Sequence, residues 1–252
     1  MDDQVQRCLA SLKSRHINGL FAENSKEAVQ NVLKLIPPKA IIGMGDSSTT
    51  RQIGLLEGLK DRGLKVLNPF EFKEPDVDFR RAHEYTDAVS REATICDVFV
   101  AGTNAITQDG RLVNVDAVGN RVAGMFWGHP ISIVIVGKNK IVRNLEEAFD
   151  RIRNIIAPNH SQIRTAASGG KARTPCAVDG QCKDCRSLDR ICNIFTIIEG
   201  QPLRTSLNVV IVNKDLGLGW DASWPEDRVN RIKDNHIKHS WRPAFEVRHQ
   251  AI

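Results

Sequence analysis

The sequence has no apolar stretch near the roughly 20 residues that a membrane-spanning helix needs, so we expect no membrane span. Its first ten residues, MDDQVQRCLA, are polar and acidic and lack the apolar centre of a secretory signal, which indicates a cytoplasmic protein. Aromatic residues make up only 6%, and dense runs of Lys and Arg are missing. Because nucleic-acid-binding surfaces combine these two features, we expect no nucleic-acid partner.

The chain of 252 residues is long enough for one large α/β domain with an appendage or for two small domains. Its hydrophobic content of 41% is typical of a globular protein. The net charge of +5 comes from residues 151–252, where Lys and Arg outnumber Asp and Glu. Such a surplus attracts an anionic partner, although an ordinary solvated surface gives the same composition.

Short apolar runs typical of buried strands alternate with helical patterns as far as residue 158. This alternation predicts an α/β protein with a doubly wound parallel sheet. We expect residues 1–158 to form the α/β core, and residues 159–252 to form a cysteine-rich extension that completes the sheet and ends in a charged tail. The expected core strands are Ala40–Ile42, Leu64–Leu67, Val98–Ala101 and Ile131–Val136.

Turn-forming pairs divide these elements. We expect Asn18-Gly19 to form a turn, and Asp109-Gly110 to close a hairpin. The pair Ala157-Pro158 is expected to end the helix that Asn144 begins.

A glycine- and hydroxyl-rich segment, GMGDSSTT at Gly43–Thr50, joins an expected strand to an expected helix. The backbone N–H groups of such a turn, with the positive end of a helix dipole, favour phosphate, carboxylate or another anion. The segment is neither a GxGxxG fingerprint nor a Walker loop. The alternative is a tight turn in which Ser or Thr caps the next helix. The candidate ligand-binding residues are Gly43, Gly45, Asp46, Ser47, Ser48 and Thr49.

The 26 residues from Cys96 to Arg121 gather small polar side chains around one expected strand end. The strand Val98–Ala101 leads into the carboxyl edge, where open parallel sheets bind ligands. Leu112–Asp116 alternates apolar and polar residues like a half-exposed strand. Each polar residue alone fits a turn former or cap, but so many together predict a shared cleft. The candidates are Thr103, Asn104, Asn114, Asp116, Asn120 and Arg121.

Four of the six cysteines lie within 17 residues, in the spacing C-x5-C-x2-C-x6-C. In a cytoplasmic chain such clustering indicates metal binding rather than disulfides. Thiolates suit an iron–sulfur cluster or zinc, and the spacing matches neither the common ferredoxin run nor the paired zinc ribbon. Lys183, Arg186 and Arg190 would offset the negative charge of a cluster. The candidate metal ligands are Cys176, Cys182, Cys185 and Cys192.

Several of these motifs occur in an order that resembles the lactate-utilisation (LUD) domain family. The match consists of GTNAITQDGRLVNVDAVGNRVAGM, then VIVGKNKIVRNLEEAFDRIR, then Ala-Pro at 157–158. The segments at Gly43–Thr50 and TPCAVDGQCKDCRSLDRICNIFTIIE fit a subgroup of that family. The resemblance implies a Rossmann-like fold of the superfamily of ribose-5-phosphate isomerases and CoA transferases.

The resemblance also limits the chemistry. Asn104 stands where sugar-phosphate isomerases have a catalytic Asp. An amide is no general base near neutral pH, so isomerisation by that mechanism is not expected. A CoA transferase needs a glutamate nucleophile, and Glu84 and Glu92 fit solvated helix positions as well as that role.

The resemblance implies that family members take part in growth on lactate and are often encoded beside iron–sulfur and oxidoreductase subunits. This favours a redox-associated protein of organic-acid metabolism that binds a small anionic metabolite and carries a 4Fe-4S cluster. One alternative is a zinc-stapled isomerase or transferase acting on a phosphorylated or carboxylated small molecule. Another is a non-catalytic subunit of a dehydrogenase. The expected protein partners are an oxidoreductase, an iron–sulfur protein or a second copy of the chain.

Overall fold

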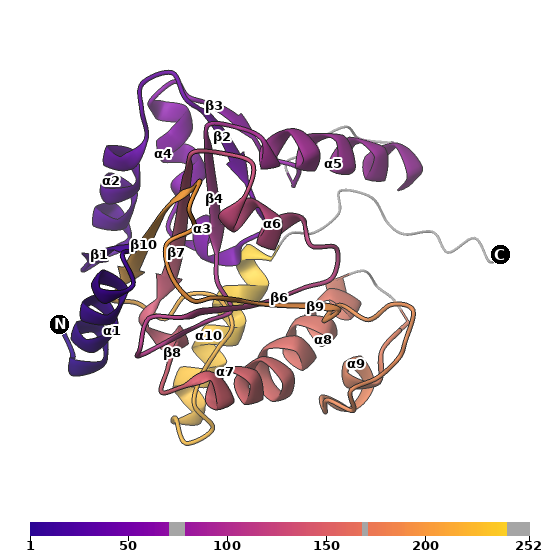
Figure 1. Ribbon diagram of the computed structural model, residues 1–252. Coiled ribbons are helices and arrows are strands. Elements are labelled where there is room, and N and C mark those ends of the chain that lie inside the picture. The colour runs from indigo at the N-terminus through magenta and orange to yellow at the C-terminus, as the bar shows by residue number, and fades with distance from the viewer. Residues whose placement is uncertain (71–78, 168–170, 241–252) are drawn as a thin grey trace.

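The computed structural model describes residues 1–70, 79–167 and 171–240, and folds them into two sheets flanked by helices (Figure 1). The larger sheet has six parallel strands in the order β1-β10-β7-β4-β2-β3. The chain is therefore α/β and Rossmann-like, and the four core strands expected from the sequence are neighbours. The strands are β1 (Asn18–Ala22), β2 (Ile41–Met44), β3 (Lys65–Leu67), β4 (Val98–Gly102), β7 (Ile131–Gly137) and β10 (Ser206–Val212).

Strand β1 shows that the expected turn at Asn18-Gly19 is wrong. Gly19 faces helix α1 (Asp3–Ser14), where a Cβ would lie 3.1 Å from atoms of Leu9 and Leu12. Asn18 donates a hydrogen bond from Nδ2 to Oδ1 of Asn208 on β10, at 2.7 Å. The glycine thus allows a helix to approach the strand closely and does not reverse the chain.

The expected extension contributes an interior strand to the six-stranded sheet. Strand β10 follows residue 158 in the sequence but lies between β1 and β7. Its side chains therefore pack in the same hydrophobic cores as the strands of residues 1–158.

The smaller sheet has the order β8-β5-β6-β9, and its strands are β5 (Ala105–Thr107), β6 (Leu112–Asp116), β8 (Ile141–Val142) and β9 (Ile194–Ile198). Strands β5 and β6 are an antiparallel hairpin, and Gly110 in its turn has φ 86°, as the pair Asp109-Gly110 predicts. Strand β6 is buried along its whole length because side chains pack on both of its faces: Val113 and Val115 lie in one hydrophobic core, and Arg121 hydrogen-bonds Asn114 and Asp116 on the other face. The expectation that Leu112–Asp116 is half-exposed is therefore wrong.

Helices cover both faces of the six-stranded sheet. Pro158 does not end the helix expected at that point, because a π-helical turn at Ile152–Ile156 leads directly into α8. The altered hydrogen-bond register of the π-helical turn accommodates the missing N–H of Pro158, and the chain continues helically to Ala167. The further helices are α2 (Ser25–Leu35), α3 (Ser48–Gln52), α4 (Leu55–Asp61), α5 (Phe79–Thr94), α6 (Asn120–Phe126), α7 (Leu145–Arg151), α8 (Ala157–Ala167), α9 (Pro175–Asp179) and α10 (Glu226–His239).

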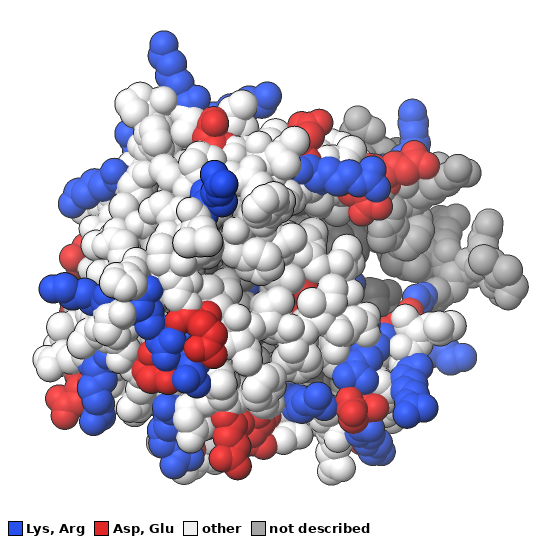
Figure 2. Space-filling view, viewed as in Figure 1, with Lys and Arg blue, Asp and Glu red and all other residues white. Residues whose placement is uncertain are grey.

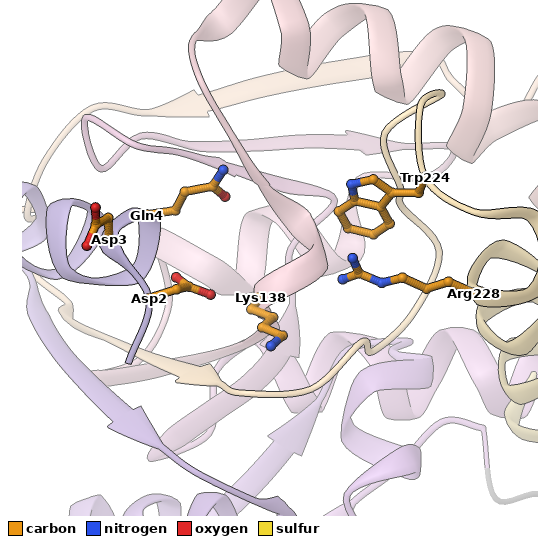
Figure 3. Close-up of a pocket in the computed structure, with 6 residues that line it drawn as sticks. All are labelled: Asp2, Asp3, Gln4, Lys138, Trp224 and Arg228. Atoms are coloured by element: carbon orange, nitrogen blue, oxygen red, sulfur yellow. The ribbon is translucent and has the colours of Figure 1, made fainter.

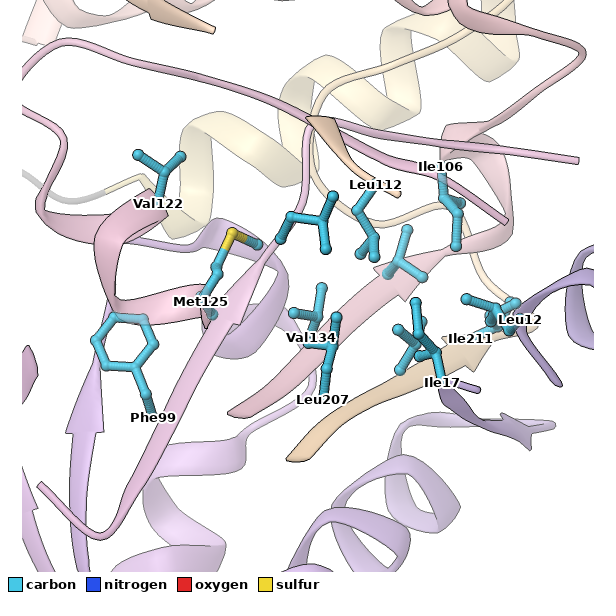
Figure 4. Close-up of a cluster of buried hydrophobic side chains, with 14 of the residues drawn as sticks. Leu12, Ile17, Phe99, Ile106, Leu112, Val122, Met125, Val134, Leu207 and Ile211 are labelled. Carbon is cyan, nitrogen blue, oxygen red and sulfur yellow. The ribbon is translucent and has the colours of Figure 1, made fainter. Parts of the chain in front are cut away.

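Alternate residues of the central strands enter two cores. Phe99, Val134 and Ile211 face the side covered by α1 and α6, where Met125 and Leu12 pack against them (Figure 4). The residues between them face α2 and α4. Each fully buried side chain of this size stabilises the fold by about 1.5–3 kcal/mol, so the strands are held from both faces.

A third core joins the smaller sheet to the C-terminal helices. Val113 of β6 and Ile152 pack with Trp220 and with Ile232 of α10. This packing holds α8 and α10 beside the sheet edge. Among the described residues, no helix is long and apolar enough to cross a membrane. On the face in Figure 2, positive and negative side chains are interspersed, as on an ordinary solvated surface.

Candidate functional site

Buried and half-buried polar side chains meet beyond the carboxyl ends of β2, β4 and β7, the edge at which parallel sheets bind ligands. We call this group the polar centre. Two helices, α8 and α10, each add one histidine to it. Its members are Asp46, Thr49, Arg51, Thr103, Asn104, Asn114, Asp116, Arg121, Lys140, His160 and His236.

The hydroxyls of the Gly43–Thr50 segment are largely used within the protein. Ser47 caps α3, accepting a hydrogen bond at Oγ from the backbone N–H of Thr50, at 3.3 Å. Thr50 donates from Oγ1 to the Ser47 carbonyl at 2.8 Å, and the Gly45 N–H donates to the Val100 carbonyl at 3.0 Å. Capping of the next helix, the alternative weighed from the sequence, is thus present at Ser47. Anion binding by this segment stays a prediction.

The glycines of the segment have packing roles. A Cβ on Gly43 would collide with the Ala93 carbonyl, and one on Gly45 would lie 2.9 Å from Cγ of Arg121 and 3.1 Å from Cζ of Phe99. A larger residue at position 45 would therefore displace Arg121 before it met any ligand.

Asp46 follows β2 and forms an ion pair with Nη2 of Arg51, at 2.8 Å. Burial acts to raise the pKa of Asp46, but the charge and hydrogen bond of Arg51, followed by His160 and Arg121, outweigh burial and hold that pKa below its usual value. Arg51 also donates from Nε to the His239 carbonyl at 2.6 Å, which fixes the end of α10 to the centre.

Arg121 brings together most of the polar residues expected from the β4–β6 region. Its Nε and Nη2 donate to Oδ1 of Asp116, at 3.0 and 2.6 Å. Nη2 also donates to Oδ1 of Asn104 at 2.8 Å, and Nη1 donates to Oδ1 of Asn114 at 2.9 Å. Arg121 is only 9% exposed, and the further bonds of its guanidinium go to the carbonyls of β4 and β6. In this geometry Arg121 organises the centre, and its contact with a ligand stays a prediction.

The remaining members of this set differ in their partners. Thr103 donates from Oγ1 to Oδ1 of Asn114 at 2.9 Å, whereas Nδ2 of Asn114 is buried without a partner among the described residues. Asp116 also accepts from the Val122 N–H at 3.0 Å, which fixes the start of α6. Asn120 points elsewhere, donating to Ser90 of α5 at 3.5 Å.

Lys140 was not predicted as a site residue. It lies just beyond β7, is 7% exposed, and donates from Nζ to the Thr103 carbonyl at 2.9 Å and to Thr49 Oγ1 at 3.3 Å. Burial, and then the charge of Arg121, lowers the pKa of Lys140 from 10.5 to about 7. Within the described ranges no carboxylate pairs with it. The sequence did carry a signal, because a lysine three residues past an apolar strand lies at the ligand edge.

Two histidines were missed as well. The rings of His160 on α8 and His236 on α10 meet edge to face, with centroids 5.9 Å apart. His236 is 5% exposed, and in the described part of the chain neither ring nitrogen has a hydrogen-bond partner. Burial is the main cause that lowers the pKa of His160 to about 4 and that of His236 to about 3. Lys140 lies close enough for its charge to contribute to the shift of His236.

The four clustered cysteines lie in residues 174–193, which we call the cysteine segment. Cys176 is on the short helix α9, and the other three lie in backbone without helix or strand. All four are half-buried free thiols. Burial raises the pKa of Cys192, with Arg190 opposing the shift and the nearby Cys182 and Cys185 adding to it. Cys192 thus lies within electrostatic reach of both Cys182 and Cys185.

The donor chemistry of the segment fits a soft metal or a cluster, because four thiols lie close together in the chain. No three His, Cys, Asp or Glu side chains are grouped as metal ligands in the parts of the chain that are described. Two of the positive side chains expected to offset the charge of a cluster already form ion pairs. Lys183 pairs with Asp179, and Arg190 pairs with Asp184 at 2.8 Å. A bound metal would have to draw the thiols together.

A cavity of about 590 Å³ lies away from both sites (Figure 3). The guanidinium of Arg228 lies 3.5 Å from the centre of the Trp224 ring and pairs with Asp215 at 2.8 Å. None of the ligand residues predicted from the sequence lines this cavity. Its lining residues are Asp2, Asp3, Gln4, Lys138, Trp224 and Arg228.

Comparison with known proteins gives one family match. The family model of the LUD domain matches residues 5–212, which include the cysteine segment but not α10. A similar solved structure is the crystal structure of a DUF162 family protein from Deinococcus radiodurans, at 13% identity and a TM-score of 0.47. The alignment covers 84% of this chain and 97% of that chain. No curated protein matches.

Proposed function

This chain belongs to the LUD domain family, and on that premise we propose that it is a redox-associated protein of organic-acid metabolism. The family's association with lactate utilisation supports a role in the metabolism of lactate or a similar acid. In this proposal the polar centre binds a small anionic metabolite, and the cysteine segment carries an iron–sulfur cluster.

Lys140 is the observation that carries the anion-binding part. A buried ammonium without a carboxylate partner is unfavourable, since desolvation of its charge is not compensated. An anionic ligand would supply the compensation. The site lies at the carboxyl edge of β2, β4 and β7, and Thr49 and Thr103 hold the lysine side chain in place there.

The cysteine segment supports the cluster part through its donor atoms. Cys176, Cys182, Cys185 and Cys192 would hold the cluster, which when bound supplies one-electron transfer. The chain's own contribution is positive charge, because Arg190 donates to the carbonyls of Cys185 and Cys192, at 2.5 and 3.1 Å. Such charge near a cluster raises its reduction potential.

Anaerobic purification of the full chain, with iron, sulfide and zinc quantified, tests the cluster. We expect iron and sulfide in equal amounts and a broad absorbance near about 400 nm. One zinc per chain without iron would instead favour the zinc-stapled enzyme as the function. Stable co-purification with a dehydrogenase, together with no binding of small anions, would favour a non-catalytic subunit.

A further inference from the structure

The outermost strands of the two sheets, β1, β3, β8 and β9, differ in how their free backbone edges are protected. Proteins protect such an edge by shortening it, by charging it or by covering it. Strand β8 has two residues, and β3 has three, of which Lys65 is exposed. In β1, the carbonyl of Phe21 accepts a hydrogen bond from Nδ2 of Asn31 on α2, at 3.0 Å. These three edges therefore carry protection against pairing with another chain.

Strand β9 lacks each of these protections. Its five residues, Ile194–Ile198, are β-branched or aromatic and carry no charge. One edge pairs with β6, and within the described ranges no strand or loop hydrogen-bonds the other edge. Ile194 and Ile197 are 37% and 38% exposed. Val118 is 79% exposed and lies beside them, because a Cβ on the next residue, Gly119, would be 3.0 Å from Cδ1 of Ile194. An apolar and unpaired edge of this kind is suited to a strand from another chain.

The sequence of β9 matches a second copy of itself. Two identical edge strands can pair antiparallel about a two-fold axis, and this arrangement closes the assembly at two chains. With the axis at Thr196, that residue lies opposite its own copy, and Phe195 lies opposite Ile197 of the second copy. Pairs of two threonines, and of an aromatic with a β-branched residue, are both favourable across strands.

The charges beside β9 permit this antiparallel arrangement. Arg190 comes shortly before the strand, and it shares Asp184 with Arg153, at 2.8 and 3.1 Å, so two positive charges meet one negative charge there. Glu199 follows the strand directly, and its side chain is 61% exposed although it pairs with Arg15. An antiparallel second copy brings the positive start of one strand toward Glu199 of the other, so like charges do not face each other.

We propose that β9 is a dimerisation edge, at which a second copy of the chain adds its own β9 antiparallel and joins the two smaller sheets into one. This pairing does not depend on the anionic ligand or on the cluster. A stable interface uses about 20–30 residues a side, far more than β9 and Val118 supply. The dimer is therefore weak, and its population follows the protein concentration.

Sedimentation velocity of the full chain over a roughly hundredfold range of concentration tests the dimer. The mean mass should rise from 28.1 kDa toward twice that value and no further. Ile197→Lys should raise the dissociation constant by at least about tenfold, because a charged side chain on an edge strand opposes pairing. Ile95→Lys is the matched control, since Ile95 is 74% exposed but lies outside the smaller sheet, and it should dimerise as the wild type does.

Three results would overturn the proposal. A wild type that stays monomeric at every concentration would leave the edge to a strand of a different protein. Masses beyond twice that of the chain would show open association in place of a two-fold pair. Equal dissociation constants for Ile197→Lys and the wild type would place the dimer contact elsewhere.

Hydrogen exchange of the wild type keeps the test valid if Ile197→Lys folds poorly. Amides of residues 194–198 should gain protection as the concentration rises, because their outward N–H groups find acceptors in the second copy. Amides of β1 should not change. Val118→Lys alters an exposed position outside the strands and should reduce the gain. Protection of residues 194–198 that is the same at every concentration would refute the pairing.

Discussion

The polar centre and the cysteine segment differ in how the chain holds their reactive side chains. In the polar centre, strand ends position the residues, and Arg121 connects Asn104, Asn114 and Asp116 through hydrogen bonds of 3.0 Å or less. In the cysteine segment, the backbone around Cys182 is without regular structure. The polar centre is thus organised by its own side chains, whereas in the proposed function a bound metal would organise the cysteine segment.

The polar interactions of the two regions differ in strength for the same reason. The pair of Arg121 with Asp116 is buried, so its loss would leave an uncompensated charge. The pairs of the cysteine segment, such as Arg173 with Asp189 at 3.2 Å, are exposed to water and contribute about 0–1 kcal/mol each. Leu188 in the same segment is fully exposed, which shows how little apolar surface this region buries.

Removal of Arg121 should therefore have the largest effect. We expect Arg121→Met to lower the free energy of unfolding by about 3–5 kcal/mol, because Asp116 would remain as a buried, unpaired carboxylate. Arg143→Met is the control, since Arg143 is 77% exposed, and should change stability by less than about 1 kcal/mol. Denaturant unfolding measures both variants. Equal effects in the two would show that the polar centre is not preorganised by Arg121.

The sequence predicted the convergence around Arg121 because it follows from local patterns. Strand alternation puts Asn114 and Asp116 on one face of β6, and the β5–β6 hairpin brings Asn104 beside them. His160 and His236 were missed because helices far apart in the sequence bring them in. Pro158 indicated a helix end, and only the π-helical turn before it shows why α8 continues through His160. Long-range packing leaves no such local signal.

Replacing one cysteine should abolish metal binding but leave the sheet intact. We expect Cys185→Ser to lose bound metal and to increase hydrogen exchange in residues 174–195, since metal–thiolate bonds would be the main source of order there. The sheet strands β2, β4 and β7 should keep their protection. Cys8→Ala is the control, because Cys8 lies on the buried face of α1, outside the cysteine segment. Unchanged metal content in Cys185→Ser would contradict the four-thiol site.

Lys140 should make stability depend on pH in the alkaline range. Its pKa is about 7 in the folded chain, against 10.5 as the ordinary value, so on acidification the unfolded chain takes up the proton first. Stability without ligand should thus fall as pH drops from 10.5 to 7 and then level off. Lys140→Met removes this penalty and should be more stable near pH 7, by about 2–3 kcal/mol after structural relaxation. Parallel pH profiles of the variant and the wild type would contradict the buried, uncompensated charge.

Replacement of His236 should have the smallest effect on the free energy of unfolding, and that effect should appear at acidic pH. Its pKa is about 3 in the folded chain, against an ordinary value of 6.5, so its contribution to stability is present above pH 6.5 and is lost as pH falls toward 3. His236→Phe should remove about 2 kcal/mol of the loss between pH 6.5 and 5, because an uncharged ring replaces one that must protonate on unfolding. Part of the acid sensitivity should remain, since His160 has a pKa of about 4 in the folded chain.

Thermal unfolding from pH 7 to 4 measures this difference, and His16→Asn, at an exposed position, should follow the wild type. If His236→Phe also follows the wild type, then His236 is reached by water in solution and is not sealed within the polar centre. The contrast in preorganisation between the polar centre and the cysteine segment would then weaken at His236, the member of the centre that lies farthest along the chain.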